Sequence, residues 1–355
     1  MRRKEPLICK IPREELGKFL KWLEDNHAPV YGLKKEGEKI TFGKISGPHD
    51  IYLGGVRSLH PYTKTLFLPP RERVARYFGE EDLPTVEEKR IIFGFKACDL
   101  RALAIYDIMF DDTVPSDPFY LAKRESYYII SFDCTEVLPT CFCVFVDGNP
   151  YPESKFDLNL TPLEDIIIME VGSQWGEVVV KKYPTWLAEP EDIKRRDLFR
   201  EEMKKKVMEV NKEFFPLSKP LTYLLRTHFD SPVWEEKSQT CVACGGCTAI
   251  CPTCYCYTLY DEEGEKTNER TRIWDYCQYP GFAQEAGGAN PRKKRMERFR
   301  HRYAHKFDYG MVRKGVYECT GCGRCISVCP GKIDMREVLL ALDQEELKKG
   351  KENVA

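Results

Sequence analysis

The 355-residue sequence predicts an α/β N-terminal domain with a small mixed or parallel sheet, followed by a mostly helical, cysteine-rich domain. Two observations predict this division. Apolar runs alternate with amphipathic segments in the first half, which is typical of βαβ units. Eleven of the 16 cysteines lie after residue 240. We therefore place the α/β domain at residues 1–213, a linker at 214–240 and the cysteine-rich domain at 241–345.

The composition excludes several classes of protein. Hydrophobic residues make up 42% of the chain and charged residues 31%, with a formal net charge of −1, so disorder and a strongly basic surface are not expected. No run of 18 uncharged apolar residues occurs, and the first residues lack the apolar core of a signal peptide. We expect a cytoplasmic protein with no membrane segment. In that reducing compartment, many thiols indicate metal binding rather than disulfides.

Apolar periodicity predicts the first elements. Residues 12–26 place four apolar side chains at the spacing of one helical face, so they predict a packing helix. Short alternating segments at residues 39–44 and 65–68 predict strands, and Pro69 and Pro70 would end the second.

A βαβ pattern follows in the middle of the α/β domain. The apolar run at residues 91–95 predicts a strand, residues 100–110 predict a helix with Asp99 as its N-cap, and the run at 127–132 predicts a second strand. Because such strands are normally parallel neighbours, residues that follow them should lie at the same edge of the sheet.

The remainder of the first half completes the domain. Residues 165–171 and 177–182 predict paired strands, and residues 189–213 predict a long charged helix. Three prolines in residues 214–240 favour a linker there.

Two cysteine runs share the spacing C-x2-C-x2-C-x3-C-P. They comprise Cys241, Cys244, Cys247, Cys251 and Pro252 in the first run, and Cys319, Cys322, Cys325, Cys329 and Pro330 in the second. In such a run three thiolates bind one 4Fe-4S cluster and the fourth ligates the other cluster. Zinc is the alternative, but zinc sites need only pairs of C-x2-C and give no reason for the third cysteine or the proline. We expect a dicluster ferredoxin-like domain with two 4Fe-4S clusters.

The spacing rule assigns the ligands. Cluster 1 takes Cys241, Cys244, Cys247 and Cys329, and cluster 2 takes Cys319, Cys322, Cys325 and Cys251. The 67 residues between the two runs are helix-permissive at 291–308, which favours a mostly helical domain over a small β-containing one.

The same insert carries a basic run between residues 292 and 306. These cations would offset the negative charge of the clusters and dock an acidic partner. A nucleic-acid-binding iron-sulfur protein, with Tyr303 and Phe307 as stacking residues, is the alternative that we disfavour.

The other cysteines form a further candidate site. Cys98 and Cys134 follow the two strands of the βαβ unit, and Cys141 and Cys143 follow closely. Four converging thiols would suffice for a third cluster, whereas a redox-active thiol pair and ordinary burial are the alternatives. Near the first run, three more cysteines are either extra ligands or small buried hydrophobes, namely Cys254, Cys256 and Cys277.

The residues in these motifs resemble a known family. The resemblance rests on CVACGGCTAICPTCYC, RTRIWDYCQ, AGGANPR, HKF, ECTGCGRCISVCP, FGFKACDLRAL and CTEVLPTCFC, and it covers most of residues 90–335. These segments are similar to the beta subunit of cytosolic sulfhydrogenases, which are NAD(P)-linked nickel-iron hydrogenases, and to the electron-transfer subunit of anaerobic sulfite reductase. The chain departs from the family pattern at Tyr276, where a small residue is usual, and this weakens a ligand role for Cys277.

The resemblance implies an electron-transfer role. It implies a non-catalytic iron-sulfur subunit of an oxidoreductase complex, which relays electrons between a flavin- and NAD(P)-reactive subunit on one side and a nickel-iron hydrogenase or sulfite reductase catalytic subunit on the other. We expect the hydrogenase type rather than the sulfite reductase type. The chain has no G-x-G-x-x-G after a strand, so FAD and NAD(P) are expected on a partner subunit, and no catalytic residue is assigned to this chain.

Overall fold

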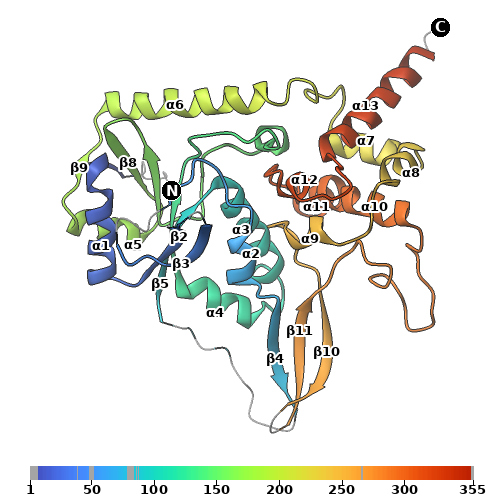
Figure 1. Ribbon diagram of the computed structural model, residues 1–355, viewed down its shortest axis with the longest axis horizontal. Helices are drawn as coiled ribbons and strands as arrows, with labels where there is room; N and C mark the ends of the chain where they lie inside the picture. Colours follow the sequence, from blue (N-terminus) through green and yellow to red (C-terminus); the bar gives the residue numbers. More distant parts are fainter. Residues whose placement is uncertain are drawn as a thin grey trace. The chain divides into compact units, whose positions relative to one another are not determined.

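The structure is a computed structural model that describes residues 7–37, 39–47, 52–77, 84, 86, 88–264 and 267–352 (Figure 1). The chain forms two compact units. The first comprises Met1–Ser58, Leu83–Leu138 and Gly148–Val207, and the second comprises Leu59–Asp82, Pro139–Asp147 and Met208–Ala355. The domain boundaries proposed from the sequence stay predictions.

A mixed sheet forms the centre of the first unit. Within the described residues it has eight strands in the order β3-β2-β5-β6-β7-β8-β1-β9. They are β1 (Ile8–Pro12), β2 (Val30–Glu36), β3 (Lys39–Lys44), β5 (Arg90–Phe95), β6 (Tyr127–Phe132), β7 (Leu158–Pro162), β8 (Ile166–Val171) and β9 (Trp186–Leu187). Strands β2, β5, β6 and β7 pair in parallel, and the other pairings are antiparallel. The expected α/β region with a mixed sheet is confirmed.

Two helices cover one face of this sheet. The helix α1 (Leu16–Asn26) follows a short 3-10 turn, η1 (Arg13–Glu15), and packs Phe19 and Leu23 against the sheet, as does α5 (Gln174–Lys182) with Val179. Alternate residues of β5 and β6, such as Phe93 and Phe132, complete this core. The helix α3 (Ala97–Phe110) connects the parallel strands β5 and β6, and its buried residues lie outside this cluster.

Two segments that we expected to be strands are helical. Residues 65–68 lie largely in α2 (Tyr62–Phe67), and residues 177–182 lie in α5. The backbone amide of Gly176 donates to Ser173 Oγ at 3.2 Å, so a helix start precedes the β-branched run of α5. Prolines 69 and 70 end a helix as well as a strand, and four alternating residues are too few to separate the two.

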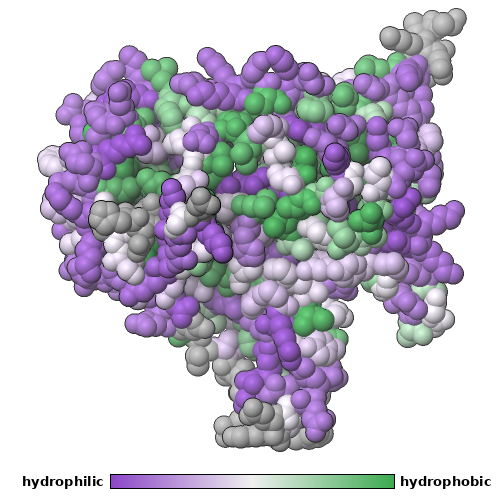
Figure 2. All heavy atoms as spheres, in the orientation of Figure 1, coloured by the Kyte–Doolittle hydropathy of each residue, from purple (hydrophilic) through white to green (hydrophobic). Residues whose placement is uncertain are grey.

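The N-cap expected for α3 is also shifted. The helix begins at Ala97, and Asp99 lies in its first turn, where the carboxylate accepts a hydrogen bond from the Lys96 backbone amide at 3.3 Å. Two further helices complete the first unit and its end, α4 (Pro118–Ser126) and the long α6 (Pro190–Glu209). The charged outer side of α6 is hydrophilic in Figure 2.

The second unit combines short helices with an antiparallel sheet. Its helical elements are η3 (Cys143–Val146), α7 (Leu221–Thr227), α8 (Val233–Ser238), α9 (Gly246–Ala249), α10 (Arg295–Ala304), the π-helix η4 (His305–Tyr309), α11 (Gly310–Lys314), α12 (Arg324–Ser327) and α13 (Met335–Glu352). The strands β4 (Arg71–Arg76), β10 (Tyr257–Glu263) and β11 (Asn268–Trp274) form the sheet, with β11 in the middle. The expectation of a mostly helical domain is therefore met only in part.

The core of the second unit is aromatic and aliphatic. Trp234 of α8, Phe299 of α10 and Phe307 of η4 are buried there together with Leu339 of α13. Residues 214–240, expected as a linker, contain α7 and α8, and Trp234 is 1% exposed. Across the described part of the chain, no helix is both long enough and apolar enough to cross a membrane.

Candidate iron-sulfur centres

The two cysteine runs fold into the same local structure. Each forms a loop that leads into a one-turn helix, α9 or α12. Ala243 and Gly321, which occupy equivalent positions, have φ of 53° and 63°, and Gly245 and Gly323 at the helix N-caps have φ of 72° and 67°. A Cβ on Gly323 would lie 2.1 Å from the carbonyl oxygen of Thr140, so the second loop needs glycine there for space as well as for its backbone conformation.

Backbone amides in these loops point at sulfur. The amide of Gly246 donates to Cys244 Sγ at 3.4 Å, and the amide of Gly321 donates to Cys319 Sγ at 3.4 Å. Such hydrogen bonds stabilise negative charge on a thiolate, and they are one of the means by which proteins set the potential of an iron-sulfur cluster.

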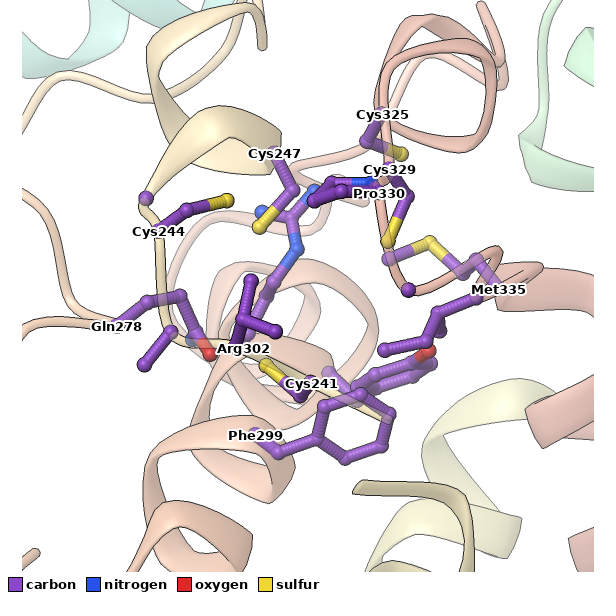
Figure 3. A pocket seen from close by; sticks show the side chains of 16 residues that line it. Cys241, Cys244, Cys247, Gln278, Phe299, Arg302, Cys325, Cys329, Pro330 and Met335 are labelled. Carbon is purple, nitrogen blue, oxygen red and sulfur yellow. The ribbon is translucent and has the colours of Figure 1, made fainter. Parts of the chain in front are cut away.

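A cavity of about 50 Å³ lies between the two runs (Figure 3). Cys241, Cys244 and Cys247 from the first run line it together with Cys325 and Cys329 from the second. The volume is several times the roughly 10–15 Å³ that one water needs. No group of three or more metal-binding side chains in the described residues is arranged to hold a single metal ion. Thiols that surround a space of this size fit a polynuclear cluster.

The cavity wall is otherwise apolar. Phe299 and Tyr303 of α10 line it with Ile333 and Met335, and Arg302 is the charged group among its lining residues. This mixture of thiols, apolar side chains and one guanidinium suits a buried group that carries negative charge.

The second set of thiols is more deeply buried. Burial raises the pKa of Cys319 and of Cys325 to about 12, and the charge of Cys251 contributes in the same direction, so these three thiols lie near one another. Burial likewise raises the pKa of Cys247 to about 11. Thiols with such pKa values stay protonated unless a metal binds, so loading of iron must release protons.

The basic run of the insert divides into buried and exposed members. Arg302 and Lys306 are 5% and 2% exposed, whereas Lys293 and Arg295 lie at the surface. Tyr303, which would stack on bases in a nucleic-acid-binding protein, is 2% exposed, and Phe307 is fully buried. The two aromatic residues are therefore core residues, and the nucleic-acid interpretation loses its stacking platform.

Comparison with known proteins agrees with the geometry. The 4Fe-4S dicluster domain family matches residues 240–333, which include both cysteine runs. The chain is 31% identical over 317 residues to Sulfhydrogenase 2 subunit beta of Pyrococcus furiosus, and the alignment covers 87% of this chain and 91% of that protein. The chain belongs to the sulfhydrogenase beta subunit family. The resemblance seen in the cysteine motifs is confirmed, and no solved structure matches the chain at a significant level.

The match to the dicluster domain leaves the other cysteines of this family member unassigned. Cys98 and Cys134 lie in the first unit, directly after the parallel neighbours β5 and β6, so they share one edge of that sheet as expected. The charge of Lys96 acts on both thiols. This lysine is 3% exposed and donates from Nζ to the Asp133 carbonyl oxygen at 3.1 Å.

Cys141 and Cys143 lie in the second unit, beside the second cysteine run. The Phe142 amide donates to the carbonyl oxygen of Gly321 at 2.8 Å, and Asn211 Nδ2 donates to the carbonyl oxygen of Cys141 at 2.7 Å. The four thiols thus fall into one pair per unit, and their convergence on a third cluster stays a prediction.

Three further cysteines follow or face the first run. Cys251 and Cys254 are in contact, and Arg302 Nη1 donates to Cys254 Sγ at 3.8 Å. Burial raises the pKa of Cys256 to about 11, and Gln278 Nε2 donates to Cys277 Sγ at 3.6 Å. The buried lysine whose charge acts on these thiols, Lys64, could not be expected from the sequence, because it lies in α2, a helix that the sequence pattern did not predict.

Proposed function

We propose that the chain is the iron-sulfur electron-transfer subunit of a cytoplasmic hydrogenase complex. In this role it relays electrons between a subunit that carries FAD and reacts with NAD(P) and a nickel-iron catalytic subunit. The observation that carries the proposal is the cavity in which Cys329 of the second run joins Cys241, Cys244 and Cys247 of the first. Interlaced ligands hold two clusters close together, as electron transfer between them requires.

We assign two centres on this basis. The first centre consists of Cys241, Cys244, Cys247 and Cys329, and the second centre consists of Cys319, Cys322, Cys325 and Cys251. The shared cavity supports the first assignment, and the mutual effect of the Cys251, Cys319 and Cys325 thiols supports the second. Cys98, Cys134, Cys141 and Cys143 remain candidates for a third cluster.

The chain's own residues have definable tasks. A 4Fe-4S cluster, when bound, supplies reversible one-electron chemistry. Phe299 and Tyr303 exclude water from the first centre, and the amides of Gly246 and Gly321 stabilise charge on sulfur. No described side chain is assigned a part in bond making or breaking, so the catalytic chemistry is proposed to reside in the partner subunits.

The hydrogenase type is favoured over the alternative. The 31% identity is to a sulfhydrogenase subunit, whereas the sulfite reductase relationship rests on the resemblance of the motifs alone. Anaerobic co-purification of the tagged full-length chain from native cells tests this choice. A nickel-containing partner supports the hydrogenase complex, and a sirohaem-containing partner would replace it with the sulfite reductase complex.

Iron analysis tests the electron-transfer role itself. Anaerobically purified protein should contain at least about eight irons per chain and show paramagnetic signals after reduction with dithionite. Zinc in place of iron, or iron that cannot be reduced, would contradict the proposal.

A further inference from the structure

Three cations are buried in the second unit among the cysteines. Lys64 of α2, Arg302 of α10 and Lys306 of η4 are 1%, 5% and 2% exposed. They come from segments that are up to 242 residues apart in the chain, so the fold assembles them. A buried charge is costly unless an opposite charge or hydrogen bonds compensate for it.

The polar contacts of the three cations are few. Lys306 Nζ donates to Thr253 Oγ1 at 2.7 Å, Lys64 Nζ donates to the Thr248 carbonyl oxygen at 3.3 Å, and Arg302 Nη1 donates to Cys254 Sγ at 3.8 Å. Lys64 Nζ also lies 3.8 Å from the centre of the Trp274 ring.

Carboxylates do not neutralise these cations. Within the described part of the chain, none of the three forms an ion pair with an aspartate or glutamate. Glu318, whose charge also acts on Lys306, is engaged by Lys314 Nζ at 2.9 Å and by His305 Nδ1 at 3.0 Å.

The cations instead face sulfur. The charges of Lys64 and Lys306 act on the thiols of Cys251 and Cys254. Arg302 acts on thiols of both runs, Cys247 and Cys325 most strongly, and its guanidinium lies among the cysteines in Figure 3. Two of the three cations are therefore specific to the side of Cys251, which belongs to the second centre, and one is shared between the centres.

We propose that Lys64, Arg302 and Lys306 form a cationic shell that raises the reduction potential of the second centre. The proposal rests on the proposed function, because it takes the ligand assignment from it. One-electron reduction adds one negative charge at the centre, breaks no bond and moves no proton, and the electron comes from dithionite in the test below. In a buried site of low effective dielectric constant, nearby positive charge stabilises the reduced form more than the oxidised form.

Redox titrations of full-length protein, followed by EPR, test the shell. Lys306→Met and Lys64→Met each remove one charge while the methionine fills the space that water would otherwise enter. Each should lower the potential of the second centre by at least tenfold in the one-electron equilibrium constant, which is 59 mV. Arg302→Met should lower the potentials of both centres, and Lys306→Arg should keep the parent value.

Two further sets of variants make the result specific. Arg300→Met removes the same charge from the same helix α10, but Arg300 contacts the Phe229 carbonyl oxygen at 2.9 Å and Asp230, so neither potential should change. Cys322→Ser and Cys244→Ser identify which EPR signal belongs to the second and to the first centre.

The outcomes separate this inference from the proposed function. Unchanged potentials in fully loaded Lys306→Met and Lys64→Met protein would overturn the cationic shell, even though the parent still shows two reducible centres. Parent protein without two reducible centres would overturn the proposed function instead. If Lys306→Met takes up less iron, Lys64→Met decides the question, because Lys64 lies far from the cysteine runs in sequence.

Discussion

Arg200 of α6 donates from Nε to Asp133 Oδ2 at 2.7 Å, directly beyond the end of β6. The Asp133 side chain is 1% exposed and also accepts hydrogen bonds from Asn159 Nδ2 at 2.8 Å and Thr161 Oγ1 at 2.7 Å. This network joins the long charged helix to the strand that precedes Cys134, so the buried ion pair fixes the sheet edge on which Cys134 lies.

Loss of Arg200 should be strongly destabilising. Arg200→Met leaves the Asp133 carboxylate buried without its cation, which typically costs about 3–5 kcal/mol. The measurement is the urea dependence of unfolding under anaerobic conditions. The matched control is Arg195→Met on the same helix, whose partner Asp165 is exposed, and it should cost no more than about 1 kcal/mol. Equal losses in the two variants would show that the Asp133 pair contributes nothing special.

Crossed ligation makes a distinct prediction for Cys329. The Cys329→Ser variant should alter the EPR signal that Cys244→Ser also alters, because both side chains line the same cavity. Cys322→Ser, within the same run as Cys329, should alter the other signal. The assignment is wrong if Cys329→Ser and Cys322→Ser instead perturb one common signal.

The third cluster can be tested by counting iron. If it exists, Cys141→Ala should lose about four irons per chain while the two ferredoxin-type signals persist. Cys9→Ala is the control, since Cys9 is a buried cysteine of β1 in the sheet core. Iron content equal to that of the parent would mean that Cys141 is an ordinary buried or surface thiol.

Acid should destabilise the protein through His301. Burial, together with the charge of Arg292, lowers the pKa of His301 to about 4, below its value of about 6.5 in an unfolded chain. Between these values the unfolded state binds the proton and the folded state does not, so stability is present above about pH 6.5 and is lost as the pH falls. The loss between pH 8 and pH 6 is roughly 1 kcal/mol.

The His301→Gln variant provides the comparison. Its free energy of unfolding should fall less than that of the parent between pH 8 and pH 6, as measured by urea unfolding at each pH. Parallel pH profiles for the two proteins would show that His301 titrates normally in the folded state.

Sequence patterns predicted the parts of the fold that depend on local spacing. The strand at 127–132 coincides with β6, and the helix at 12–26 is divided only by a 3-10 turn. The pattern failed at residues 177–182, where Val178, Val179 and Val180 favour a strand but Ser173 begins a helix that packs Val179 onto the sheet. Packing there outweighs the preference of β-branched residues.

The cysteine motifs were likewise legible because ligand spacing is local. The cations around them were not, since Lys64 reaches the cysteines only through the placement of α2 in the second unit. Tyr303 and Phe307 looked like an exposed stacking pair because a basic run surrounds them. Only the packing of α10 and η4 shows that they face the core.

The sharing of one cavity by both cysteine runs has a consequence for biosynthesis. Cys329 is made 88 residues after Cys241, so on the ribosome the first three thiols wait for their fourth wall while the whole insert emerges. Maturation must therefore follow translation of the insert, and a nascent chain stalled within it would expose thiols that have no completed site to occupy.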